Sequence, residues 1–245
     1  MSVNPENSNN PFDYVGKYHN EVLDAFISEL SSDSVSFENP LTFCTWMFKF
    51  ITDTSLSITA PGIVEPGMVS DTLTPMVLSV NYYEQSLTDV LDVYTLTEEQ
   101  KLYFTDLNDF IVSAEIESEE QLQDFVNSII AKENQVSSVF EGNGEYVMQM
   151  AYSMLSVAKY SAVYWHDNFS DPDSSWSNLT ITFENEEVWD IGESAAAPTH
   201  WSEYVAEDAV GALSAVYLSL GAVGPWGALA SAAFSTGWSI LKDNA

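Results

Sequence analysis

A run of 33 consecutive residues without a charged side chain, from Ala209 to Leu241, constrains this chain more than any other feature. The rest of the chain is strongly acidic, and the formal net charge of the whole protein is -31. A long uncharged and largely apolar segment must be shielded from water by the fold, by a partner or by a membrane. We therefore expect the carboxyl-terminal fifth of the chain to decide how the protein works.

The uncharged segment is predicted to form a helical hairpin over residues 206–245, as part of the same domain as the rest of the chain. Its middle is rich in proline and glycine, which remove a helical donor and accept turn conformations. Small residues recur every four positions on both arms, a spacing that lets two helix backbones approach closely. The predicted packing and hinge residues are Gly211, Ala215, Ser219, Gly224, Pro225, Gly227, Ser231 and Ser235.

The length of the two arms bears on where this hairpin lies. Each arm has about 15 residues and is roughly 23 Å long, whereas a bilayer core of about 30 Å needs about 20 residues. Three locations stay open: the interior of the body, a membrane after a rearrangement, and an interface with another chain. The interior is favoured because apolar segments of this length are more often buried core.

Composition excludes one class of function. The chain has 37 acidic residues, and its six cationic residues are all lysine, so it contains no arginine. Nucleic-acid binding depends on clustered cations, with arginine preferred for its planar fork, so we expect no nucleic-acid partner. The acidity favours solubility, and it leaves cation binding or a basic partner as alternatives.

The amino-terminal residues indicate a default location. Met1 to Pro11 carry no apolar run, so we expect no secretory signal and a cytoplasmic protein, with leaderless export as an alternative. We also expect residues 1–10 to be disordered. Cys44 is the single cysteine and lies in an apolar setting typical of an inert buried thiol.

The body from residue 11 to 205 is predicted to be mainly α-helical. Helical spacing of apolar residues predicts helices over about 11–31 and from Pro40, over about 74–94, and from Gly144 to about His166. Capping boxes at Thr97 and Ser118 predict two more helices. The stretch 58–67 reads as a loop, and alternating residues over 178–191 predict one small β-hairpin. The fold class is therefore a helical bundle with one β-hairpin and a small-residue helical hairpin.

The start of the chain carries a resemblance. The run Asn10-Pro11-Phe12-Asp13-Tyr14-Val15-Gly16, followed by His19-Asn20 and by the Gly/Ala-rich end, resembles a family of uncharacterised bacterial proteins. This resemblance implies no activity. The layout of an uncharged hairpin near the end of an α-helical bundle is similar to that of pore-forming colicins, which is an analogy of layout.

Catalytic signatures are absent from the sequence. There is no G-x-S-x-G elbow, Walker loop, G-x-G-x-x-G or H-E-x-x-H, so we expect no cofactor and a protein that is not an enzyme. The acidic segment 167–190 contains Asp167, Asp171 and Asp173, whose carboxylates suit calcium, although the spacing fails the EF-hand pattern. The sequence predicts action through protein or membrane contact; the alternative is a calcium-dependent binding protein or hydrolase.

Overall fold

The computed structural model describes residues 3–32, 36–59, 87–92, 96–142, 145–177, 179–184, 188–190, 201–218, 232–233 and 235. These residues are mostly helical, which confirms the predicted fold class. The elements are α1 (Tyr14–Leu30), α2 (Pro40–Thr59), α4 (Leu87–Asp92), α5 (Glu98–Val112), α6 (Glu119–Glu133), α7 (Val136–Val139), α8 (Glu145–Ser170), β1 (Thr180–Thr182), β2 (Val188–Asp190) and α10 (Trp201–Leu218).

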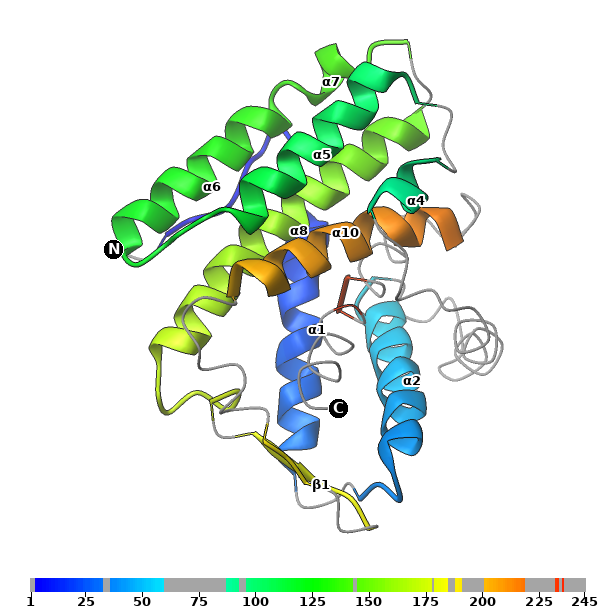
Figure 1. The fold of residues 1–245 in the computed structure, drawn as a ribbon, viewed down its shortest axis with the longest axis vertical. Helices are drawn as coiled ribbons and strands as arrows, with labels where there is room; N and C mark the ends of the chain where they lie inside the picture. Colours follow the sequence, from blue (N-terminus) through cyan, green and yellow to red (C-terminus); the bar gives the residue numbers. More distant parts are fainter. Residues whose placement is uncertain are drawn as a thin grey trace.

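Helix α8 is the centre of the bundle. It packs against α1, α6 and α10, and Figure 1 shows α10 crossing the middle of the molecule between α5 and α6 on one side and α1 and α2 on the other. The sequence predicts a single apolar face for α8. Instead, every residue from Met150 to Ala162 is buried, because neighbouring helices cover the helix on all sides.

The amino-terminal segment differs from its predicted disorder. Residues 3–10 are ordered, and Asn7 and Asn10 are both buried with their amides bonded to Glu133. The first helix also begins later than predicted, at Tyr14. Asn10 accepts a hydrogen bond from the backbone N–H of Phe12 at 2.8 Å and so starts a turn that precedes the helix. Tertiary contacts therefore hold a segment whose polarity alone favours disorder.

Helix α2 begins at Pro40, as predicted. Asn39 caps it through a reciprocal pair of hydrogen bonds with Thr42, each 3.1 Å long. Its aromatic residues pack against α1 and against the segment that carries the β-strands, with Phe43 in contact with Phe183. The helix extends to Thr59, so residues 58 and 59 are helical and the remainder of the predicted 58–67 loop lies outside the described residues.

The predicted β-hairpin is confirmed as an antiparallel pair. Strands β1 and β2 pair with Ile181 opposite Trp189, and Phe37 forms a parallel bridge to Phe183. This bridge, which lies outside both strands, attaches the chain after α8 to the segment before α2. Both predicted caps are present, but only Thr97 forms a complete capping box, because the Gln121 amide oxygen accepts from the backbone N–H of Glu117.

The described part of the uncharged segment is helical. Gly211 and Ala215 lie in α10, where the side chains of Ala212 and Leu213 are fully buried, and Ser235 is helical beyond it. Most of the predicted turn and second arm lies outside the described residues, including Ser219, Gly224, Pro225, Gly227 and Ser231. Of the helix predicted over 74–94, the structure describes only residues 87–92, as α4.

Candidate functional site

A close contact between α1 and α8 explains one residue of the amino-terminal run. The backbone N–H of Gly16 donates to Ser156 Oγ at 2.9 Å, and that hydroxyl in turn donates to the backbone carbonyl of Asp13 at 2.8 Å. A Cβ at position 16 would lie 2.3 Å from the backbone oxygen of Ser156. Only glycine allows the two helices to approach this closely.

The polar residues of the same run also contact α8. The Asn10 amide donates to the Tyr152 carbonyl at 3.1 Å, and the Asn20 amide donates to the Tyr160 carbonyl at 3.0 Å. Asn10, Asp13, Gly16 and Asn20 thus follow α8 along its length. The run that carries the family resemblance is, in this fold, the α1–α8 interface.

Buried charges form the first of two clusters at this interface. The Lys159 ammonium is fully buried and donates to Glu133 Oε2 at 2.7 Å and to Asp13 Oδ1. The Asn7 and Asn10 amides donate to Glu133 at 2.7 and 2.6 Å, and the Tyr160 hydroxyl donates to Asp13 at 3.0 Å. Such a cluster is strongly destabilised when one partner is removed, because a buried charge is left uncompensated.

Burial dominates the electrostatics of Glu133. It raises the pKa of this carboxyl above its ordinary value, and the Lys159 charge together with the Asn7 and Asn10 amides opposes that rise. The stability that depends on the protonated form of Glu133 is fully present below its pKa in the unfolded chain, and it is lost as the pH rises through the folded pKa.

Asp208 of α10 is the centre of the second cluster. Its carboxylate accepts hydrogen bonds from the Ser161 hydroxyl and from the Trp165 indole N–H, the latter at 3.0 Å, and it lies 3.6 Å from His19 Nε2. Serine, histidine and aspartate meet here, but all three are fully buried and the aspartate stands between the other two. Substrate has no access to Ser161, so the cluster joins α1, α8 and α10 rather than forming a nucleophile triad.

Sequence reasoning missed both clusters. Asp13 and His19 lie in the run that carries the resemblance, and no sequence pattern singles out Glu133, Lys159 or Asp208. Lys159 falls on a predicted helix, but nothing local marks it as buried. The sequence gives only a weak indication that Lys159 is buried, because it is the single lysine in the largely apolar stretch that forms α8.

The predicted calcium residues do not converge. Asp167, Asp171 and Asp173 are all exposed, and the Asp171 carboxylate accepts a hydrogen bond from the backbone N–H of Asp173 at 2.9 Å, which forms a local turn. Within the part of the chain that the structure describes, no three histidine, cysteine or acidic side chains are grouped as a metal ion needs. The calcium alternative gains no support from this geometry. Cys44 is buried, and burial raises the pKa of its thiol to about 11, as the apolar setting predicts.

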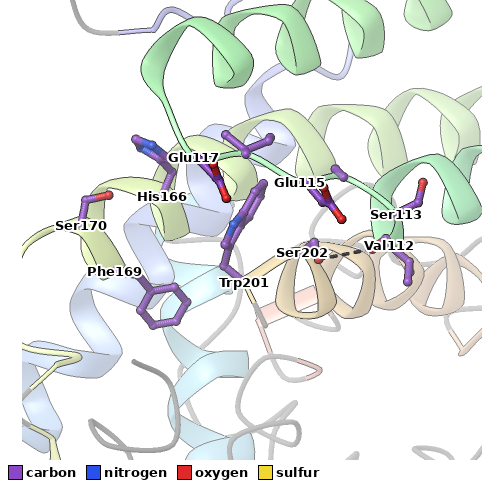
Figure 2. Close-up of a pocket in the computed structure, with 11 residues that line it drawn as sticks. Val112, Ser113, Glu115, Glu117, His166, Phe169, Ser170, Trp201 and Ser202 are labelled. Atoms are coloured by element: carbon purple, nitrogen blue, oxygen red, sulfur yellow. Dashed lines mark hydrogen bonds between the residues drawn. The ribbon is translucent and has the colours of Figure 1, made fainter. Parts of the chain in front are cut away.

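A cavity of about 740 Å³ lies where the α5–α6 loop, the end of α8 and the start of α10 meet. In the view of Figure 2 the Trp201 indole lies between Glu117 and Glu115, and His166 and Phe169 from α8 lie on the same side of the indole as Glu117. The Ser202 hydroxyl donates to the Val112 carbonyl at 3.4 Å and connects α10 to the end of α5. No sequence pattern brought these residues together, because they come from three separate elements.

Comparison with known proteins gives no relative. No protein-family model, no curated protein and no solved structure matches this chain. The resemblance in the amino-terminal run therefore stays a prediction. Among the described helices, none is both long enough and apolar enough to span a bilayer.

Proposed function

We propose that this chain is a non-enzymatic protein that acts by contact with another protein or a membrane, and that its uncharged carboxyl-terminal segment makes that contact. The start of this segment, which lies in α10, packs against α8 at rest and detaches when the protein acts. The proposal extends the sequence-based expectation of a helical hairpin over 206–245.

The attachment of α10 to α8 is the observation that supports the proposal. Asp208 is the last charged residue before the 33-residue uncharged stretch, and its carboxylate bonds to Ser161 and Trp165 of α8. Immediately after it, Ala209, Ala212 and Leu213 are fully buried. This carboxylate therefore joins α10, which contains the start of the uncharged segment, to the central helix, and we expect its loss to loosen α10.

The bonding of the buried polar groups also supports a contact function over a catalytic one. The buried polar groups with distinctive geometry are bonded to one another across helix interfaces, which is a structural use of their chemistry. A large apolar segment in an otherwise acidic protein is, by contrast, typical of a surface that binds another protein or a membrane. The net charge of -31 further predicts repulsion from anionic lipid, so neutral vesicles are the preferred membrane target.

Dye release from vesicles tests the membrane form of the proposal. The protein, Asp208→Asn and the matched exposed control Asp171→Asn are compared on phosphatidylcholine vesicles at neutral and acid pH. Asp208→Asn is expected to release more dye than the other two, because a neutral amide oxygen accepts the Ser161 and Trp165 hydrogen bonds more weakly than the charged Oδ2 that accepts both in the native protein.

Two outcomes contradict the membrane form. The first is an absence of release by all three proteins at both pH values while each unfolds cooperatively as a monomer. The second is equal release by Asp208→Asn and Asp171→Asn, which would mean that loosening α10 is irrelevant. Protein contact would then be the surviving form, and chemical crosslinking through residues of α10 would test it.

A further inference from the structure

The cavity beside Trp201 contains the chemistry that recognises an organic cation. Its wall includes the carboxylates of Glu115 and Glu117 and the rings of Trp201 and Phe169. Its volume of about 740 Å³ lies within the range of roughly 300 to 1,000 Å³ that ligand pockets occupy. Aromatic faces attract cations through their quadrupole, and tryptophan does so best.

The carboxylates are available to a ligand. Glu115 and Glu117 are exposed, and among the described residues neither has a salt-bridge partner. In the view of Figure 2 they lie on either side of the Trp201 indole. Both carboxylates therefore line the same cavity as the aromatic rings.

The aromatic wall is held in place by the fold. Trp201 is 5% exposed, and its ring packs edge-on against Phe125 with ring centres 6.5 Å apart. Ile116, between the two glutamates, is buried, which directs its neighbours to the outside of the loop. A site with rigid rings loses little conformational entropy when it binds its ligand.

We propose that this cavity binds an arginine side chain presented by a basic segment of a partner protein. The guanidinium is planar, stacks on aromatic rings and forks onto carboxylates, so it suits a cavity lined by aromatic rings and two carboxylates better than a compact ammonium does. The chain itself contains no arginine, so the guanidinium must come from another molecule. A net charge of -31 attracts a basic partner over long range and speeds association.

This inference goes beyond the proposed function, because it assigns a second contact surface and the chemistry of a partner. It uses the loop and helix ends around Trp201 and does not depend on release of the uncharged segment. Vesicle assays and peptide-binding assays therefore succeed or fail separately.

Fluorescence anisotropy of two labelled peptides tests the inference on the full chain. The peptides are Gly-Arg-Gly-Arg-Gly and its lysine counterpart, which have the same charge and length. The arginine peptide is expected to bind more tightly. Glu115→Gln/Glu117→Gln is expected to weaken its binding at least about tenfold at roughly 0.15 M salt, because a flanked cation loses both charge-assisted bonds.

The matched control removes two charges from a nearby exposed surface. Glu120→Gln/Asp124→Asn changes α6 residues outside the cavity wall, and it is expected to weaken binding less than about twofold because screening limits distant charges. Trp201→Phe is expected to give an intermediate loss, since phenylalanine is the weaker cation partner. Trp201 is buried, so Trp201→Phe also disturbs the packing of the fold. The result with the exposed glutamates therefore decides the test.

Three results would overturn the inference. Equal losses in the two glutamine-containing pairs would show diffuse attraction by an acidic surface. Equal affinity for the arginine and lysine peptides would show that the ring and fork geometry has no role. A lack of measurable binding by either peptide would show that the cavity does not bind cationic side chains.

Discussion

Replacing Gly16 with alanine tests the closest helix contact in the protein. The new Cβ would lie 2.3 Å from the backbone oxygen of Ser156 and 2.7 Å from its carbonyl carbon, whereas ordinary contacts begin at 3.4 Å. The obstacle is backbone, so it cannot rotate away. Helix α1 must retreat from α8 by about 1 Å, which is a large shift for a close-packed interior.

The expected cost follows from what this retreat breaks. Overpacking of a core contact costs about 1–3 kcal/mol. The hydrogen bonds from Gly16 N–H to Ser156 and from Ser156 to the Asp13 carbonyl are each worth about 1 kcal/mol. Alanine returns about 1 kcal/mol through its higher helix propensity. We expect a net loss of about 2–4 kcal/mol and, at about 2–4 °C per kcal/mol, a melting temperature lower by roughly 5–15 °C.

Thermal and urea unfolding followed by circular dichroism measures this loss. Ser28→Ala is the matched control, because position 28 lies on the exposed face of the same helix and the change introduces the same residue. The control is expected to be neutral or slightly stabilising. If Gly16→Ala were as stable as the native protein, the close α1–α8 contact would not exist in solution and the arrangement of the amino-terminal run would be wrong.

The other predictions concern the buried charge cluster and the cysteine. Lys159→Met leaves the buried Glu133 carboxylate without its cation, so we expect a loss of about 3–5 kcal/mol in unfolding free energy at pH 7. Burial raises the pKa of Glu133. The loss of stability caused by Lys159→Met should therefore shrink as the pH falls towards 5, because the carboxyl becomes protonated. Urea midpoints at pH 7 and pH 5 measure this change, and a loss that grows in acid would contradict the assigned pKa direction. Adding Glu133→Gln to Lys159→Met should recover part of the lost stability at pH 7, and no recovery would mean that the pair is not coupled. The Cys44 thiol, with its pKa raised to about 11, should resist a disulfide reagent at pH 8 in the folded protein and react fully in urea, and rapid labelling of the folded protein would refute its burial.

Patterns that act within one helix or strand were predictable from the sequence. The capped starts of α2 and α5, the alternation in β1 and the apolar spacing of α1 are local, because each depends on residues within a few positions of one another. Burial of polar residues was not predictable in this way. Asn7, Asn10 and Lys159 have polar side chains that favour exposure when judged alone, and only partners more than 20 positions away make their burial possible.

The sequence by itself determined that this protein is helical, acidic and arginine-free, with an uncharged segment that needs shelter from water. Tertiary structure decided the rest: it closed α1 onto α8 at Gly16, paired Lys159 with Glu133, tied α10 to α8 through Asp208 and brought Trp201 to the same cavity as Glu115 and Glu117. The physical reason is that helix formation and capping are short-range effects, whereas buried charge pairs and cavities exist only where separate elements meet.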